Sequence, residues 1–191
     1  PAVAMEGDAQ RYAGTYTGRG RGAPQSLTVS VENGALTAPF RGAMSVPQGT
    51  FAIRQRVYYH HTDAGGVVYH SNFLNFAERA RTECLRHMGL EQGKLKEKEQ
   101  FVFVVSKAEI AFKRPGRLDD ALVVETRLQT IRKARMSMRQ IVRKDETVLA
   151  EMTIEIACVS LSNFRSMPVP AHIVAIFAQH LPFEVITEEN L

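Results

Sequence analysis

The strongest pattern in the chain is a helical one that follows a loop rich in polar residues. Apolar residues recur there at intervals of three and four, which places them on one face of an α-helix: Phe73, Ala77, Ala80, Cys84 and Met88. Ser71 is suited to cap the start of this helix, and Gly89 suits the left-handed conformation in which many helices end. The segment is therefore predicted to form a long amphipathic helix.

Strand patterns surround this helix. The alternation is clearest in residues 147–161, where the even positions are apolar and Glu151, Thr153 and Glu155 occupy the opposite face. Further strands are predicted at the start of residues 51–63 and in residues 101–116, 121–133 and 135–145, and a short helix in residues 170–182. A strand, a long helix and four consecutive strands indicate an α+β fold, with the helix lying across a curved antiparallel sheet.

The first 49 residues have a different character and are rich in small residues. Within them, SLTVSVENGALTA alternates on both sides of Asn33-Gly34, a dipeptide that favours the positive φ angles of a tight hairpin turn. We expect residues 1–49 to be a Gly-rich extension with a β-hairpin, in which RYAGTYT adds a third strand. Residues 50–191 are expected to form the main domain, including the C-terminal helix.

Composition narrows the class of protein further. The 191 residues are 45% hydrophobic and 23% charged, which suits one globular core with an appendage. No apolar run approaches the roughly 18 residues that cross a bilayer, and the N-terminal residues lack a signal-peptide pattern, so a cytoplasmic protein without a membrane span is expected. A formal charge of +4 is too small to indicate nucleic-acid binding, and Cys84 and Cys158 are expected to be core residues.

The densest group of polar residues is HHTDAGGVVYHSN, residues 60–72, between the first strand and the long helix. Gly65 and Gly66 allow a tight turn and a close approach to a ligand, and the helix start offers unpaired amide N–H groups at the positive end of the helix dipole. Such a site stabilises a developing oxyanion. Asp63 could act there as a general base or a nucleophile, with His70 as a hydrogen-bonding or proton-transferring partner. The combination suits acyl transfer.

This region also resembles a known family. RVYYHHTDAGGVVYHSNFLNFAERARTECLRHMG, FKRPGRLDDALVVET and the N.R..P.P stretch near the end are similar to the 4-hydroxybenzoyl-CoA thioesterase family, and most closely to its Tol-Pal-associated acyl-CoA thioesterase branch. The resemblance covers Phe51 to Leu181 and implies a hotdog fold that hydrolyses acyl-CoA thioesters. It implies that Asp63 is the catalytic carboxylate and that His70, which begins the long helix, offers a backbone N–H to the thioester carbonyl.

The resemblance has consequences for substrate contacts and partners. We expect the substrate to be contacted by Gly66, Val68, Tyr69 and Asn72, without a cofactor or a metal. Two chains are expected to pair their sheets edge to edge with active sites at the interface, as a homodimer or a homotetramer, which agrees with the open edges of a single sheet. An acyl carrier protein is a further candidate partner. The alternative from another functional class is a non-catalytic module that binds acyl-CoA or acyl carrier protein in a cell-envelope complex.

Several candidate residues have a plainer structural alternative. Asp63 could serve simply to cap a turn rather than act in catalysis, and Tyr69 could simply pack rather than line the acyl pocket. Four residues, His60, His61, Asp63 and His70, could instead bind a metal, although the resembling family needs none. The His60-His61 pair is a departure, because relatives often have acidic residues there.

Charged residues outside the loop leave alternatives open too. A salt bridge between Glu78 and Arg81 is favoured over a position of Glu78 in the neighbouring active site. Coenzyme A carries phosphates, which could be contacted by basic residues at predicted strand ends and turns, unless these form only a solvated rim: Arg114, Arg132, Lys133 and Arg135.

Overall fold

The computed structural model describes residues 14–19, 24–32, 35–37, 49–181 and 184–185. The chain divides into two compact units, Pro1–Ser45 and Val46–Leu191, and each is considered by itself. The elements of the second unit are, in chain order, β4 (Phe51–Arg56), a 3₁₀ turn (Tyr59–His61), α1 (His70–His87), α2 (Gln92–Lys94), a π-helical turn (Leu95–Glu99), β5 (Phe101–Phe112), β6 (Ala121–Ile131), β7 (Arg135–Lys144), β8 (Thr147–Ser160), α3 (Ala171–His180) and β9 (Glu184–Val185).

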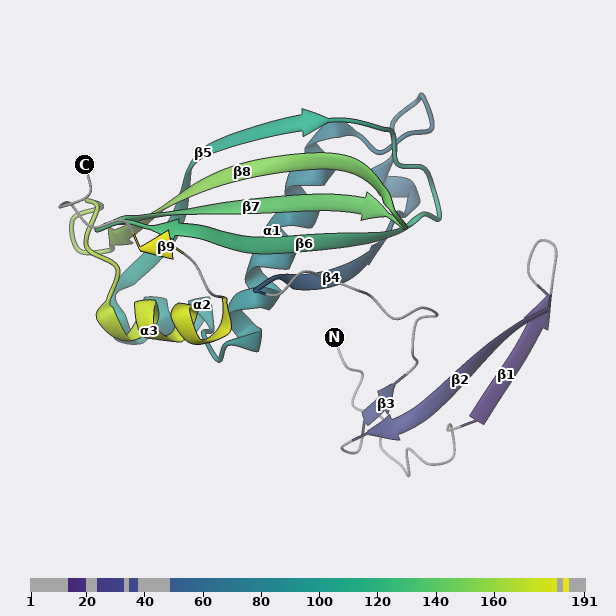
Figure 1. Cartoon of the computed structure of the whole chain (residues 1–191), viewed down its shortest axis with the longest axis horizontal. Coiled ribbons are helices and arrows are strands. Elements are labelled where there is room, and N and C mark those ends of the chain that lie inside the picture. The colour runs from purple at the N-terminus through teal and green to yellow at the C-terminus, as the bar shows by residue number, and fades with distance from the viewer. Residues whose placement is uncertain (1–13, 20–23, 33–34, 38–48, 182–183, 186–191) are drawn as a thin grey trace. The chain divides into compact units, whose positions relative to one another are not determined.

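The second unit is built on one sheet with α1 against it. The strands follow the order β4-β6-β7-β8-β5, all neighbours in this path are antiparallel, and β9 pairs with β6 in the parallel sense. Figure 1 shows α1 lying across one face of this curved sheet. The predicted α+β fold, with a helix laid across an antiparallel sheet, is therefore confirmed.

The core lies between the helix and the sheet. The apolar stripe predicted from the sequence is buried along α1 and at Met88, and Phe76 and Leu85 extend it. On β8 the even positions from Ala150 to Cys158 are buried, whereas Glu151 is only partly so. Both cysteines are buried and free, as expected, and burial raises the pKa of the Cys84 thiol to about 12 and that of Cys158 to about 11.

The start of α1 differs from the prediction by one residue. The helix begins at His70, so the predicted cap residue Ser71 lies inside its first turn. The residue before the helix is Tyr69, whose extended backbone is held because its N–H donates to the His61 carbonyl over 2.9 Å. At the other end, Gly89 has a φ of 78°, which fits the predicted left-handed position.

The first unit contains a small antiparallel sheet. Its strands are β1 (Gly14–Arg19), β2 (Pro24–Glu32) and β3 (Ala35–Thr37), in the order β1-β2-β3, with Glu32 opposite Ala35. The predicted turn residues Asn33 and Gly34 lie outside the described residues. The function of this unit, and a domain boundary at residue 50, stay predictions.

Within the described ranges, no helix has the length and apolar character that spanning a membrane requires.

Candidate active site

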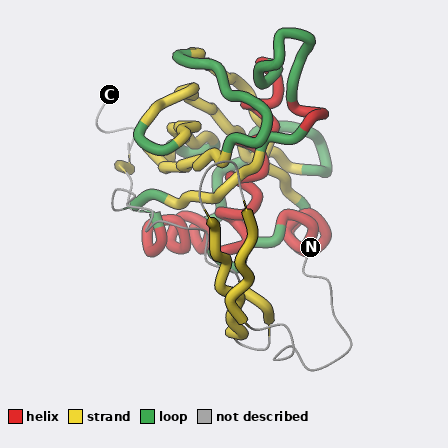
Figure 2. The backbone as a smooth tube through the Cα atoms, turned by 90° about the vertical axis from the view of Figure 1, so that its right-hand side faces the viewer, coloured by secondary structure: helices red, strands yellow, loops and turns green. Residues whose placement is uncertain are grey.

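The polar loop before α1 folds into a narrow hairpin at one end of the sheet. Its two arms are joined by a bridge between Thr62 and Val68, and the Asp63 N–H donates to the Val67 carbonyl over 3.0 Å. Figure 2 views the molecule from the right-hand side of Figure 1 and shows several loops gathered at this end of the second unit. The hairpin places Asp63 at its tip and leads the chain directly into α1.

Asp63 is exposed, and one of its carboxylate oxygens is held by the backbone. Its Oδ1 accepts a hydrogen bond from the Gly65 N–H over 2.8 Å and a longer one from the Val67 N–H over 3.5 Å. Gly66, with a φ of 71°, closes the turn by donating its N–H to the Asp63 carbonyl over 3.0 Å. The turn-capping role considered from the sequence is thus present. It engages Oδ1 and leaves Oδ2 without a hydrogen-bond partner among the described residues.

The helix start provides hydrogen-bond donors close behind this turn. The first amides of an α-helix lack a carbonyl partner within the helix. The Asn72 N–H is satisfied by the Tyr69 carbonyl over 2.8 Å, whereas the structure gives the N–H groups of His70 and Ser71 no acceptor among the described residues. Two unpaired donors at the positive end of the α1 dipole can bind a developing negative charge.

His61 connects the loop to the start of α1 through hydrogen bonds and ring packing. Its carbonyl accepts hydrogen bonds from the Tyr69 N–H and from Asn72 Nδ2, both over 2.9 Å. Its ring is 2% exposed, lies edge-on to Phe76 at 4.8 Å, and accepts the Tyr58 N–H at Nδ1 over 3.0 Å. Burial lowers the pKa of His61, and the positive charges of His60 and Arg79 add to this shift.

The residues predicted to contact substrate fall into two groups. Gly66 and Tyr69 are exposed at the hairpin and the helix start. Val68, in contrast, is buried, and the side chain of Asn72 donates a hydrogen bond to the His61 carbonyl. Substrate contacts by these four residues stay predictions. In the structure Val68 packs in the core and Asn72 connects the helix start to the loop.

His70 stands between the loop and the end of the edge strand β5. Its ring is exposed and lies 4.3 Å from that of Tyr69 and 6.4 Å from that of Phe112, measured between ring centroids. The four residues considered as metal ligands do not form a metal-binding group, because the described part of the chain brings no three His, Cys, Asp or Glu side chains together for one.

The turn after β5 contacts the hairpin that carries Asp63, and the sequence did not reveal this contact. The Gly116 carbonyl accepts the Val68 N–H over 2.8 Å, and Val67 forms a bridge with Arg117. A Cβ atom on Gly116 would stand 2.9 Å from Val68 Cγ2, closer than packed side chains come. From the sequence, the Pro115-Gly116 pair indicated only the end of a strand. Its contact with Val68 could not be predicted, because the two positions lie far apart in the sequence.

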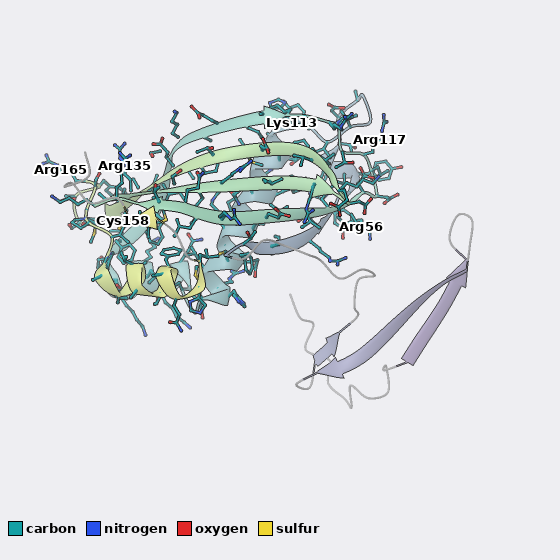
Figure 3. All side chains as sticks on the ribbon, viewed as in Figure 1. Arg56, Lys113, Arg117, Arg135, Cys158 and Arg165 are labelled. Atoms are coloured by element: carbon teal, nitrogen blue, oxygen red, sulfur yellow. The ribbon has the colours of Figure 1, made fainter. Side chains whose placement is uncertain are left out.

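Two expectations about charged residues are changed by the structure. The salt bridge predicted between Glu78 and Arg81 is wrong: Glu78 accepts the Thr82 hydroxyl over 2.7 Å, and Arg81 donates to Gln140 over 2.6 Å. These partners are closer at hand, since Thr82, which donates to Glu78, is one helical turn beyond it, and Gln140, which accepts from Arg81, faces the helix from β7. The basic residues considered as contacts for the coenzyme A phosphates do not all lie together. Figure 3 shows Lys113 and Arg117 at one end of the sheet and Arg135 and Arg165 at the other. Arg114 directly follows Lys113 in the chain, whereas Arg132 and Lys133 belong to the turn that leads to Arg135, where the Arg132 N–H donates to the Arg135 carbonyl.

Comparison with known proteins places this arrangement in a family. Residues 57–177 match the family model described as the thioesterase-like superfamily. An acyl-CoA thioesterase YbgC from Haemophilus influenzae is 39% identical over 127 residues, 66% of this chain and 93% of the relative. An acyl-CoA thioester hydrolase YbgC from Escherichia coli O6:H1 is 42% identical over 125 residues, 65% of this chain and 92% of the relative.

A solved structure agrees with these sequence matches. A probable thioesterase from Bartonella henselae superposes with a TM-score of 0.61 and 35% identity, covering 63% of this chain and 99% of that one. The hotdog fold predicted by resemblance is thereby confirmed. The loop, α1 and strands β5 to β8 fall within the matched residues, and the chain belongs to the thioesterase-like superfamily.

Proposed function

We propose that this protein hydrolyses the thioester bond of acyl-CoA, with Asp63 as the catalytic carboxylate and the start of α1 as the oxyanion hole. The observation that carries the proposal is the hairpin itself. It presents Asp63 with an Oδ2 that has no hydrogen-bond partner among the described residues, and it leads into the helix start, where the N–H groups of His70 and Ser71 likewise have no acceptor. Acyl transfer needs a carboxylate that can act on water or on the carbonyl carbon, and fixed amide donors that stabilise the negatively charged carbonyl oxygen.

The reaction requires water to replace the thiol of coenzyme A. As a general base, Asp63 takes a proton from water while the water oxygen bonds to the thioester carbon. As a nucleophile, Asp63 bonds to that carbon, and water then cleaves the resulting anhydride. In both routes the carbonyl oxygen becomes negatively charged and is held by the amides of α1, the carbon–sulfur bond breaks, and the thiolate leaves with a proton.

A panel of acyl-CoA thioesters, scored by release of free thiol, tests this function directly. We expect turnover for at least one acyl class and loss of turnover when Asp63 is replaced by Asn. If the wild-type protein binds acyl-CoA and cleaves none of the panel, the non-catalytic binding module is the correct interpretation.

Assembly through the edge strand β5 is the second part of the proposal. Among the described strands β5 pairs only with β8, so its outer edge leaves backbone N–H and C=O groups unpaired. Large apolar side chains are exposed on this strand, with 46% of Val105 and 52% of Phe112 accessible. Pairing β5 with β5 of a second copy would satisfy the edge and cover these side chains.

We therefore predict a homodimer or a homotetramer in solution. Light scattering at micromolar concentration measures the mass. A monomer that retains thioesterase activity would contradict this part of the proposal.

Two finer points of the proposal, membership of the Tol-Pal-associated branch and an acyl carrier protein as a further partner, are supported by the sequence resemblance alone. A cytoplasmic location is a third point, and its support is the hydropathy pattern of the sequence. Thiol release from acyl-CoA and from the matching acylated carrier protein, compared at equal concentration, tests the second of these points.

A further inference from the structure

A cavity of about 120 Å³ lies beside the second half of α1, away from the hairpin. Most of its wall is apolar and comes from β5, β7, β8 and α3, with Phe103, Met138, Ile156 and Phe177 among the lining residues. Its polar residues include Arg81 and Glu78, both on α1. A mainly apolar cavity with a few fixed polar groups is the usual form of a small-molecule site.

A buried polar network fixes the guanidinium of Arg81 in this wall. Gln140 is fully buried, and its Nε2 donates to the Ala77 carbonyl over 2.9 Å and to Thr126 Oγ1 over 2.8 Å. These two bonds orient the amide so that its Oε1 accepts Arg81 over 2.6 Å. Polar groups buried in a core destabilise it unless they are paired, and here the Nε2 and the Oε1 of Gln140 both have partners, which fixes the orientation of the amide.

Arg81 has more donors than the protein satisfies. The guanidinium carries five N–H groups, and Gln140 is its one hydrogen-bond acceptor within the described part of the chain. The nearby Glu78 is engaged by Thr82, whose hydroxyl in turn accepts Gln92 Nε2 over 2.9 Å. Burial lowers the pKa of Arg81 and the charge of Glu78 opposes that shift, but an Arg side chain remains charged.

We propose that this cavity binds the distal end of the acyl group, and that Arg81 selects acyl groups that carry a hydroxyl or keto oxygen there. The oxygen would accept one of the free guanidinium N–H groups, while the apolar wall covers the carbon atoms before it. A neutral oxygen fits better than a carboxylate, because Glu78 places a negative charge on the same cavity.

This inference rests on the proposed function and on the dimer that it includes. Within one chain, Arg81 lies eleven residues beyond His70, about 16 Å along the helix, which a short acyl group cannot span. A symmetric pairing of two β5 strands is antiparallel and brings the Phe112 end of one chain to the Phe101 end of the other. His70 lies near Phe112, and the cavity residue Phe103 lies near Phe101, so this pairing would bring the partner's helix start toward this chain's cavity.

Matched pairs of substrates test the proposal. Each pair consists of an unsubstituted acyl-CoA and its ω-hydroxy counterpart, and the acyl chain is lengthened from pair to pair. The readout is the ratio of kcat/KM for the hydroxylated thioester to that for the plain one. For the wild type we expect a ratio of at least about ten at one chain length, the factor that a hydrogen bond to a charged donor supplies.

Substitutions of Arg81 test whether its guanidinium causes the preference for the hydroxylated thioester. In Arg81→Met, which keeps a long apolar side chain, the ratio should fall to about one. In Arg81→Lys, which keeps the charge but loses the planar fork, it should take an intermediate value. Arg86→Met is the matched control, because Arg86 is an exposed arginine of α1 that pairs with Glu83 and does not line the cavity, and it should keep the wild-type ratio.

The outcomes separate this inference from the proposed function. A wild-type ratio near one at every chain length, or an unchanged ratio in Arg81→Met, overturns the role of Arg81. If Arg81→Met does not fold, the decrease expected in Arg81→Lys decides. If the wild type cleaves neither member of any pair, the proposed function fails, and the ratio of the two Kd values from calorimetry then tests the cavity by itself.

Discussion

Within the part of the chain that the structure describes, both halves of α1 present N–H groups without an acceptor, but these donors are positioned in different ways. At the helix start the donors are backbone amides of His70 and Ser71, and their directions follow from the helix geometry. Further along, the donor is the side chain of Arg81, which depends on Gln140 for its orientation. The first site is exposed and surrounded by backbone hydrogen bonds, whereas the guanidinium of Arg81 is half-buried and lies among side-chain hydrogen bonds.

This difference determines what substitution can do at each site. A backbone donor survives almost any change of its own side chain and is lost only when the chain around it moves. A side-chain donor is removed by one substitution. We therefore expect the helix start to be sensitive to residues that shape the loop, and the Arg81 cavity to be sensitive to Arg81 itself.

The largest effect is expected at Asp63. Asp63→Asn keeps an Oδ1 that can accept the Gly65 N–H, so the turn should persist, but the carboxylate that we propose as base or nucleophile is gone. The chemical step should slow by roughly 10²- to 10⁴-fold while substrate binding remains. Single-turnover rates together with a binding titration measure both quantities. Near-normal turnover by the folded variant would reject Asp63 as the catalytic carboxylate.

His70→Ala sharpens the comparison between backbone and side-chain donors. The substitution leaves the amide at position 70 in place, so it should cost less activity than Asp63→Asn. If the imidazole transfers a proton, the two losses will instead be similar. Parallel measurement of kcat for the two variants on one substrate separates these roles.

Substitution of Gly116 tests whether displacing the hairpin lowers activity when Asp63 and the helix-start amides are themselves unchanged. Because a Cβ at Gly116 would stand 2.9 Å from Val68 Cγ2, Gly116→Ala should displace Val68 and with it the hairpin that leads to His70. We expect kcat to fall about tenfold or more and stability to fall by about 1–3 kcal/mol. Adding Val68→Ala removes the clashing methyl groups and should recover part of both losses. A double variant that is as impaired as the sum of the two single changes would argue against this contact.

The sequence predicted the loop better than the cavity for a physical reason. The hairpin is local: Asp63, Gly65, Gly66 and His70 lie within eight consecutive residues, so their spacing alone indicates a turn that enters a helix. The apolar periodicity likewise predicted α1 and the strands, because burial of one face imposes a period on each element. Contacts between distant elements leave no such period.

The network around Arg81 shows this limit most clearly. It joins Arg81 on α1 to Gln140 on β7 and Thr126 on β6, and only the sheet order makes these three residues neighbours. From the sequence, Glu78 was the natural partner of Arg81, because residues three apart on a helix are adjacent. The buried Gln140 competes successfully, since it is held rigidly by two other bonds and stands within reach of the guanidinium.

A smaller effect is expected from the titration of His61. In the folded state its Nδ1 accepts the Tyr58 N–H, which a protonated ring cannot do, and burial lowers the pKa of His61 below its ordinary value of 6.5. The unfolded chain therefore binds this proton more readily, so stability should be complete above about pH 6.5 and decrease as the pH falls toward the lower, folded-state pKa. The loss should be about 1 kcal/mol, the size of one hydrogen bond.

His61→Asn isolates this contribution, because an Asn side chain can accept the Tyr58 N–H without titrating. Urea unfolding at about pH 8 and about pH 5 measures the difference in stability for the wild type and for the variant. The difference should be smaller in the variant, although other groups titrate in both proteins. Equal differences would show that His61 does not contribute to the loss of stability in acid.

The smallest effect is expected from removal of the first unit, which contains neither of the two donor sites. Every candidate residue of the hairpin, the helix start and the Arg81 cavity belongs to Val46–Leu191, and the family match begins at residue 57. Deleting the residues before Val46 should therefore change kcat by less than about tenfold, or about 1.4 kcal/mol in the barrier. The shortened protein should be checked for folding and assembly by circular dichroism and light scattering before turnover is compared. A larger loss in a folded protein of unchanged mass would mean that the first unit contributes to the site, and the ratio for ω-hydroxy and plain substrates would then show which of the two donor sites it affects.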